Sequence, residues 1–521
     1  MRAYKSFSTL LYSLLLFTTV VRCLVAYMVE LGNDEVYYFT YAVQPDWNHF
    51  DHPPLVGLFI RLFTLNLHWI NDVSVRLPAI IGAATSTWLI AHCGRLIKNE
   101  RTGLIAAVLY SASLYTSLIA GLFILPDSVQ LPFWLAGLYL MLQIATAPDS
   151  EKLNRRMVEV GVLTGLAILC KVHGVFLWFG FIGYVVFHER SLLKNPYLYI
   201  SLGVPLLMAS PIVIWNVANH FVSWQFHSER VVANQGVDWK SFMTTSLGQV
   251  AYNNPIILYV HYRVIEATLR RVPFVNRPAL KLVCWTSIPI VLATSFVSLF
   301  RTTLPHWSGP GFVGLLLLAA AYLDFKLSQG AVKYATRLLR ASVILIATVV
   351  VLGVGLIQYF PGTLNHTSEP KTGAGDFTLD MYGWRSFQSA FSKVHREDIR
   401  SGRMTADAPL LVNKWFPGGH LFYYVAYPLK LRLVGAGELK DLHKFSWLNR
   451  LYGSVQPGSD AYFITPSNYF SNPNTLYGND FQQIDEPTKI VQYRNGKIAR
   501  YFYVYRLRNA RRVVGEQITR K

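Results

Sequence analysis

Long apolar runs separated by short polar loops recur along the first 360 residues of the chain. Many of these runs approach the roughly 20 residues that a helix needs to cross a bilayer, so the pattern predicts membrane spans and not one large soluble core. We expect about eleven spans. They are residues 7–29, 77–96, 103–124, 128–145, 157–170, 172–187, 197–215, 246–265, 282–300, 310–323 and 341–359.

The pattern changes at Pro361. From there, short apolar strings alternate with Gly, Pro, Asn, Asp and Ser, which is typical of a water-soluble α/β domain. We expect strands at 409–413, 431–434, 461–465 and 500–506, and a helix at 418–426. The chain is therefore predicted to have two domains, a transmembrane domain at 1–360 and a soluble α/β domain at 361–521.

Charge in the loops predicts the orientation of the spans. Alternate loops such as GRLIKNER and SEKLNRRM are basic, and basic short loops tend to stay in the cytoplasm. The N-terminus would lie on that side, and an odd number of spans would place residues 361–521 outside. The first outer loop, at 30–73, contains the apolar segment 54–70, which Arg61 and His68 interrupt. We interpret that segment as an amphipathic helix in the membrane interface.

Composition supports a membrane protein and argues against a nucleic-acid partner. Hydrophobic residues make up 52% of the chain and charged residues only 15%. The formal net charge is +19, but Lys and Arg are scattered through loops and the tail and form no single basic stripe. The four cysteines, at 23, 93, 170 and 284, lie inside or beside apolar spans, so we interpret them as inert packing residues.

Ionisable residues from distant parts of the chain gather in the predicted outer loops. Asp127 and Lys171 stand out, because each lies in a very short turn between two apolar spans. Such a turn holds its side chain near the membrane surface, where charged groups usually face an aqueous cavity or a partner. This placement suits a reaction on a substrate whose tail lies in lipid and whose head lies at the interface.

Several short motifs along residues 7–325 resemble one family. The stretches LGNDEVYYFTYA, DHPPLVGLFIRLF and VSVRLPA, followed by ILPDSVQLPFW, GLAILCKVHGVFL and RTTLPHWSGPGF, are similar to the polyprenyl-phosphate-dependent transferases. That group includes protein O-mannosyltransferases and the bacterial aminoarabinose transferase of lipid A. No single motif is decisive alone.

The resemblance implies a polytopic α-helical glycosyltransferase of the GT-C type with a C-terminal extracytoplasmic α/β domain. The enzyme would move a hexosyl or pentosyl group, with inversion, from a polyprenyl-phosphate-linked sugar to a hydroxyl or phosphate of lipid A, a surface glycan or a protein. It would be a multi-pass protein of the bacterial inner membrane, in contact with membrane lipids, with its active site and C-terminal domain in the periplasm.

The resemblance also implies roles for particular residues. Asp34 would be the catalytic base, with Glu35 supporting it, although an acidic pair also commonly marks the water boundary after an apolar helix. His52, Lys171 and Arg301 would bind the donor phosphate. Each has an alternative: His52 could fix the Pro-Pro turn, Lys171 could extend to the membrane surface, and Arg301 could bind lipid headgroups. Aminoarabinose transferases have a lysine in place of His52 and mannosyltransferases a histidine, so the closer subfamily stays open.

Three further residues are expected to support the site. Asp127 would orient Lys171 or the sugar, or would simply cap a helix N-terminus. His306 and Trp307 lie where the family often has an aromatic residue facing the donor, and Trp307 could equally belong to an interfacial belt. His173 and His220 are interpreted as structural.

No metal ion or other cofactor is required by the sequence, although Asp34, Asp127 and a donor phosphate could share a divalent cation. Two other functions compete with glycosyl transfer. A transporter or lipid flippase would also be polytopic, but its charged sites should lie near the bilayer midplane. A non-catalytic membrane assembly protein would need no convergence of Asp34, His52, Asp127 and Lys171 at all.

Overall fold

The computed structural model describes residues 6–146, 150–231 and 236–515. The chain forms two compact units, and each unit is made of separate stretches of sequence. The membrane unit comprises Met1–Leu24, Asp51–Phe63 and Val73–Val350. The sheet unit comprises Val25–Phe50, Thr64–Asp72 and Val351–Lys521. The C-terminal domain predicted at 361–521 is thus joined in its unit by residues 25–50 and 64–72.

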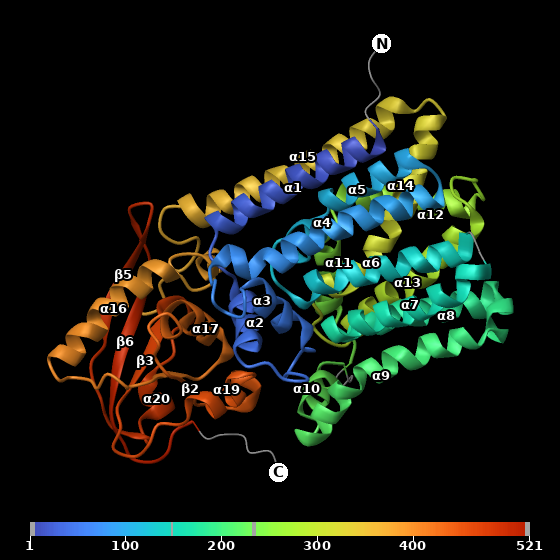
Figure 1. Cartoon of the computed structure of the whole chain (residues 1–521). Helices are drawn as coiled ribbons and strands as arrows, with labels where there is room; N and C mark the ends of the chain where they lie inside the picture. The colour runs from blue at the N-terminus through green and yellow to red at the C-terminus, as the bar shows by residue number, and fades with distance from the viewer. Residues whose placement is uncertain (1–5, 147–149, 232–235, 516–521) are drawn as a thin grey trace. The chain divides into compact units, whose positions relative to one another are not determined.

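The membrane unit consists of helices. In order, the helices up to Tyr359 are α1 (Phe7–Met28), α2 (Asn33–Val43), α3 (Leu55–Phe63), α4 (Asp72–Ile97), α5 (Glu100–Ala112), α6 (Pro126–Thr146), α7 (Ser150–Cys170), α8 (Val175–His188), α9 (Pro196–Ala218), α10 (Val222–Val231), α11 (Trp239–Tyr252), α12 (Pro255–Leu269), α13 (Arg277–Ser298), α14 (Gly309–Ser328) and α15 (Val332–Tyr359). Of these, α2 belongs to the sheet unit. Helix α7 packs between α6 and α9, as Figure 1 shows.

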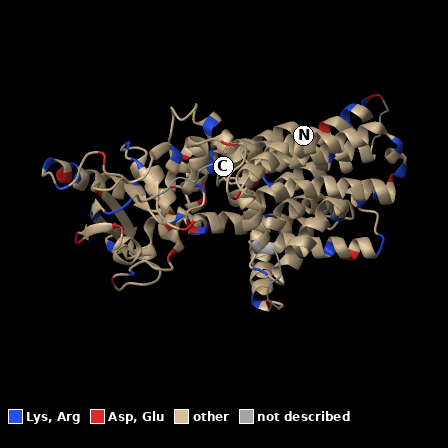
Figure 2. Cartoon of the chain, turned by 90° about the horizontal axis from the view of Figure 1, so that it is seen from below, with Lys and Arg blue, Asp and Glu red and all other residues tan. Residues whose placement is uncertain are grey.

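Seven helices in the described part of the chain are long and apolar enough to cross a membrane: α1, α4, α6, α9, α13, α15 and the stretch Pro305–Ser328 that contains α14. Helix α8 is apolar but shorter, at 14 residues. Charged residues gather at the ends of the helices, and the lengths between are almost free of them (Figure 2). The polytopic helical architecture is confirmed, and the number of eleven spans stays a prediction.

Two of the predicted spans are not single helices. The span expected at 246–265 is broken into α11 and α12, because Asn254 has a positive φ of 65° and Pro255 lacks the N–H that a continuous helix needs. The Asn254 side chain donates hydrogen bonds to the carbonyls of Ala112, at 2.9 Å, and Ser342, at 3.1 Å. The break therefore links three helices of the bundle.

The span expected at 103–124 also changes form along its length. Helix α5 ends at Ala112, and a π-helical turn, η1 (Tyr115–Ile119), follows it. The amphipathic segment expected at 54–70 is helical only in α3, since Leu65, Asn66 and Leu67 all have positive φ. Both differences arise where the chain turns within packed structure, which apolar periodicity does not report.

The sheet unit is built on six strands. They are β1 (Leu410–Val412), β2 (Leu433–Gly435), β3 (Ala461–Pro466), β4 (Phe481–Ile484), β5 (Thr488–Arg494) and β6 (Lys497–Ala510). The order is β2-β1-β3-β6-β4, with β5 also paired to β6; β1 runs parallel to β2 and β3, and the other pairs are antiparallel. Every residue of β1, β2 and β3 is buried, as expected of strands covered on both faces.

Helices surround this sheet and complete the unit. They are α16 (Trp384–Arg400), α17 (Trp415–His420), α18 (Leu439–Leu442), α19 (Phe445–Tyr452) and α20 (Pro473–Tyr477), with a π-helical turn η6 (Leu421–Ala426) and short 3-10 turns η5 (Phe377–Met381) and η7 (Ser467–Tyr469). The predicted strands coincide with β1, β2, β3 and β6 within a few residues. The helix expected at 418–426 is divided between α17 and η6. Strands β4 and β5 and helix α16 were not predicted.

Two buried carboxylates join the separate stretches of the sheet unit. Glu30 accepts hydrogen bonds from the backbone N–H groups of Trp384, at 2.7 Å, and Arg385, at 3.0 Å, at the start of α16. Asp72 accepts from the hydroxyls of Tyr424, at 2.9 Å, and Tyr423, at 3.2 Å, and pairs with Arg385. Residues 25–50 and 64–72 are therefore held by polar contacts as well as by packing.

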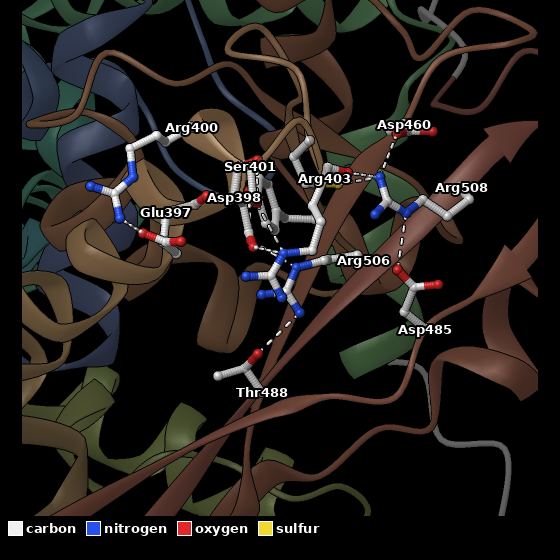
Figure 3. Close-up of polar contacts among 12 residues, drawn as sticks. Glu397, Asp398, Arg400, Ser401, Arg403, Asp460, Asp485, Thr488, Arg506 and Arg508 are labelled. Carbon is white, nitrogen blue, oxygen red and sulfur yellow. Dashed lines mark hydrogen bonds and ion pairs between the residues drawn. The ribbon is translucent and has the colours of Figure 1, made fainter.

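A buried ion pair fixes the other end of α16. Figure 3 shows Asp398 beside Arg506 of β6, with 2.7 Å between the carboxylate Oδ2 and Nε. The hydroxyl of Tyr462 donates to the same oxygen at 3.1 Å. Arg508, two residues further along β6, pairs with Asp460 at 2.8 Å and Asp485 at 3.0 Å. These contacts bind α16 and the loops around it to the long strand.

Loss of the Asp398 carboxylate should loosen this region. We expect Asp398→Asn to cost about 3–5 kcal/mol, because Arg506 would keep a buried charge without its partner. Hydrogen exchange measured by mass spectrometry should then be faster in peptides from α16 and β6. The matched control is Glu397→Gln in the same helix, whose carboxylate pairs with Arg400 on the surface; it should leave exchange unchanged. Equal exchange in the two variants would contradict the prediction.

Candidate active site

Asp127 and Lys171 form a buried ion pair in the membrane unit. The Lys171 Nζ lies 3.0 Å from Oδ1 and 2.8 Å from Oδ2 of Asp127. The two residues are only 2% and 3% exposed. Lys171 thus does not extend to the protein surface but binds a carboxylate inside the bundle. Each charge lowers the cost of burying the other.

The local backbone explains why Lys171 points inward. Helix α7 ends at Cys170, and Lys171 itself is extended, with φ −157° and ψ 130°. Gln130, one turn after Asp127 in α6, donates its amide to the carbonyls of Ala167, at 2.9 Å, and Lys171, at 2.7 Å. Gly174 closes the turn where a Cβ would lie 2.6 Å from the nitrogen of Ile168. Helix α6 therefore contacts both the charge and the backbone of the turn.

Tyr115, which the sequence did not reveal as a site residue, is bonded to the Asp127–Lys171 pair. Its hydroxyl donates to Asp127 Oδ1 at 3.0 Å, and the residue is fully buried in the π-helical turn η1. Gly309 packs against its ring so closely that a Cβ there would lie 2.2 Å from Cζ. π-Helical turns often occur at functional sites. In the sequence, Tyr115 lies inside the predicted span 103–124, 12 residues before Asp127, and no local pattern marks it.

Three histidines lie close enough to the pair for their charges to interact with it: His52, His173 and His306. The His173 ring is 5.8 Å from that of Trp307, and the His306 ring is 6.3 Å from that of Tyr252. The structure therefore places His52 and His306 near Asp127 and Lys171, and Trp307 beside His173. Their roles in the site stay predictions. The structure adds His173, which the sequence suggested was only structural.

His52 is held in its neutral form. Burial lowers the pKa of His52 to about 4, and the positive charge of Lys171 acts in the same direction, against the attraction of the Asp51 carboxylate. The His227 ring lies 6.3 Å away, and its Nε2 is 2.9 Å from the carbonyl of Asp51. A neutral imidazole next to a lysine can both donate and accept hydrogen bonds.

Arg301 lies in the segment between α13 and η4 (Pro305–Ser308), the 3-10 turn that carries His306 and Trp307. Its carbonyl accepts a hydrogen bond from the Ser241 hydroxyl at 2.8 Å, and the hydroxyls of Thr245 and Thr303 are 3.0 Å apart. This segment is thereby fixed against α11. The role of the Arg301 side chain at a phosphate stays a prediction.

Asp34 and Glu35 lie in the first turn of α2, within the sheet unit. Glu35 is buried, and its Oε2 accepts from the backbone N–H of Gly32 at 2.8 Å, which caps the helix. Asp34 is exposed. Glu35 thus supports the turn that presents Asp34, at a helix N-terminus whose dipole favours a negative charge.

A second carboxylate is linked to this turn through Asn33. Its Nδ2 donates to Oδ2 of Asp380 at 3.0 Å, and the Tyr469 hydroxyl donates to Asp380 Oδ1 at 3.1 Å. Burial nevertheless raises the pKa of Asp380 to about 6. Asn33, the residue preceding Asp34, is thus bound to a carboxyl whose pKa is raised to about 6.

In residues 6–146, 150–231 and 236–515, no group of three or more His, Cys, Asp or Glu is arranged to hold a metal ion. The expectation that the protein needs no cation stays a prediction, because a donor phosphate could supply ligands of its own.

Comparison with known proteins gives a consistent assignment of the fold. Residues 51–215 match the family described as dolichyl-phosphate-mannose-protein mannosyltransferase. No curated protein matches the sequence. ArnT from Cupriavidus metallidurans is similar in structure in its apo state, with a TM-score of 0.62 and 15% identity over 96% of this chain and 98% of that chain.

The same ArnT bound to undecaprenyl phosphate gives a TM-score of 0.59 at 15% identity, over 95% of this chain and 97% of that chain. The predicted resemblance is confirmed, and so is the predicted fold class of a polytopic helical protein with a C-terminal sheet domain. The number of spans and the side of the membrane on which that domain lies stay predictions. At this identity the structural likeness concerns the fold, and the roles of individual residues stay predictions.

Removal of the Tyr115 hydroxyl should weaken the buried pair. We expect Tyr115→Phe to lower the free energy of unfolding by about 1–3 kcal/mol, since a hydrogen bond to a charged acceptor is lost. The measurement is the thermal midpoint of the purified protein in lipid nanodiscs. Tyr110→Phe is the control, because Tyr110 is also buried but its hydroxyl is not bonded to a carboxylate within the described residues. The same midpoint for both variants would refute the role of Tyr115.

Asp380 should make stability depend on pH in a defined direction. The pKa of Asp380 is about 6 in the folded protein, above its unfolded value of 3.8. The contribution of Asp380 to the free energy of unfolding is therefore complete below pH 3.8 and is lost as the pH rises through 6. We expect the wild type to lose up to about 3 kcal/mol over this window relative to Asp380→Asn. Thermal midpoints of both proteins from pH 4 to 8 measure the difference; parallel curves would contradict it.

Proposed function

We propose that this chain is an inverting glycosyltransferase that moves a sugar from a polyprenyl-phosphate donor to an acceptor hydroxyl or phosphate. The observation that carries the proposal is the buried Asp127–Lys171 pair with the histidines near it. Asp127, Lys171 and His52 lie within the stretch that matches the mannosyltransferase family. An enzyme of this class needs a cation at the donor phosphate, and Lys171 is the buried cation of this cluster.

The reaction would be a single displacement. The acceptor oxygen attacks the anomeric carbon, the bond from that carbon to the phosphate oxygen breaks, and polyprenyl phosphate leaves with the electron pair. The acceptor proton passes to the Asp34 carboxylate. Because the leaving phosphate gains negative charge, cations placed at its oxygens stabilise the transition state more than the bound donor.

Each residue has a defined part in this proposal. Lys171 and Arg301 would bind the phosphate oxygens, and neutral His52 would donate a hydrogen bond. Asp127, itself held by the Tyr115 hydroxyl, would keep the Lys171 ammonium in place. When the donor binds, the ammonium would exchange part of its contact with Asp127 for a contact with the phosphate. His306 and Trp307 would face the sugar.

The remaining features follow the resemblance. The sugar would be a hexose or a pentose, and the acceptor would be lipid A, a surface glycan or a protein. The reaction would take place at the periplasmic face of the bacterial inner membrane, where the donor's polyprenyl chain lies in lipid. The structure of ArnT bound to undecaprenyl phosphate supports this donor class for the shared fold.

The direct test supplies the purified protein in nanodiscs with undecaprenyl-phosphate sugars and with lipid A, glycan or peptide acceptors. Mass spectrometry should find the acceptor heavier by one sugar residue and free undecaprenyl phosphate in equal amount. Turnover should persist in EDTA if no divalent cation takes part. Movement of the intact donor across the membrane, with no glycosylated product, would instead indicate a flippase.

The base can be tested by one substitution. We expect Asp34→Asn to lower kcat about 10²–10⁴-fold with little change in donor binding, since only proton removal in the transition state is lost. Asp46→Asn, in the same outer loop but outside the proposed site, is the control and should keep full turnover. An Asp34→Asn variant as active as the control would exclude Asp34 as the base.

A further inference from the structure

A cavity in the sheet unit, lined by none of the residues assigned to the transfer step, has the composition of a ligand site. Its volume is about 470 Å³, and it opens at the carboxyl end of β2. Four separate segments line it: the turn 435–437, the region of α18 and α19, the stretch 476–480 and the stretch 512–515. In open α/β sheets, ligands bind at the carboxyl ends of parallel strands, and this volume is within the range of small-molecule sites.

One buried side chain, Asn449, holds the backbone of two glycines that line the cavity. Asn449, which is 1% exposed, accepts from the N–H of Gly435 at 2.8 Å and donates to the carbonyls of Gly435, at 2.8 Å, and Gly515, at 3.2 Å. Gly515 has a φ of 82°, and a Cβ on it would lie 2.2 Å from Val434 Cγ1. Glycine is therefore required at position 515, and the bonds of Asn449 fix the backbone of Gly435 and Gly515 in one geometry.

The polar wall carries balanced charge. Asp480 Oδ1 accepts from Arg512 Nε at 2.5 Å, with the carboxylate 11% exposed and the guanidinium 70% exposed. Tyr477 donates its hydroxyl to the carbonyl of Ala436 at 2.9 Å and so closes one side. Ser446 adds a hydroxyl. Because the one anion and the one cation neutralise each other, the cavity favours an uncharged ligand over an anion or a cation.

The lining also has an apolar part, which Leu439, Leu442 and Leu476 provide. A ligand that fits both parts needs hydroxyls, to donate to a carboxylate and accept from a guanidinium, and a C–H surface. A sugar ring has both properties. From this combination we infer that the cavity binds one neutral sugar ring of a glycan.

This site would serve recognition and not chemistry. It lies within the soluble part of the chain and contains none of the residues assigned to the transfer step. If the proposed function holds, the ring belongs to a glycan acceptor, and the cavity selects acceptors by their sugar. Binding itself does not depend on that function.

Saturation-transfer NMR on the full chain in nanodiscs tests the inference, because maltoside or glucoside detergents would compete for the site. Methyl α-D-mannopyranoside and methyl α-D-glucopyranoside are the probes, with glucose 6-phosphate and inorganic phosphate as charged comparisons. We expect transfer to at least one neutral glycoside. Absence of transfer to both, or displacement of the bound glycoside by inorganic phosphate, would overturn the inference.

Two variants locate the binding. Ser446→Phe should fill the cavity and abolish the saturation-transfer signal of the glycoside. Asp480→Asn should weaken glycoside binding about tenfold by removing a charged acceptor. Ser389→Phe and Asp407→Asn are matched controls at exposed positions outside the cavity, and should bind as the wild type does. An unchanged saturation-transfer signal in both cavity variants, with thermal midpoints equal to those of the controls, would overturn the assignment of the sugar to this cavity.

The assay separates this inference from the proposed function because it contains no donor and no turnover. Glycoside binding without glycosyl transfer would refute the proposed function alone. Glycosyl transfer without glycoside binding would refute the sugar site alone.

Discussion

Opposite charges at the start of α6 and just after the end of α7 constrain how the helices of the membrane unit pack. An isolated Asp127 or Lys171 in this setting would be strongly destabilising, and removal of either one would leave the other buried without a partner, at a cost of about 3–5 kcal/mol. Their 2.8 Å contact therefore requires α6, α7 and the turn η1 to keep one relative position. The same ion pair fixes the position of the Lys171 ammonium. A donor phosphate that bound there would replace part of its contact with the Asp127 carboxylate.

The sheet unit obeys the same rule with different groups. Glu30 and Asp72 come from the first 72 residues, and their carboxylates bind backbone N–H groups, tyrosine hydroxyls and Arg385 far along the chain. A buried acceptor stabilises the fold in which all its hydrogen bonds are made. Any other arrangement of the chain would leave that acceptor without partners and would be higher in free energy. This explains how residues 25–50, which carry Asp34, are part of a unit made mainly of the C-terminal residues.

The two proposals assign different tasks to the two units. Lys171, with Asp127 and Tyr115, would bind the leaving phosphate, a charged group with a lipid tail. The cavity beside β2 would bind a neutral ring, and its paired Asp480 and Arg512 suit that ligand because they leave no net charge. Charged and neutral recognition would thus be carried by sites of different electrostatic character, and under these two proposals each could be altered without changing the other.

The sequence by itself determined that most of the first 360 residues form apolar helices, the approximate positions of β1, β2, β3 and β6, and the candidacy of Asp127 and Lys171, because apolar periodicity and charged turns depend on neighbouring residues alone. Only the tertiary structure decided that Tyr115 bonds to Asp127, that Asn254 breaks a predicted span while linking three helices, and that residues 25–50 and 64–72 join the sheet unit. Those outcomes depend on which buried polar groups find partners across long sequence distances. No local pattern encodes that choice.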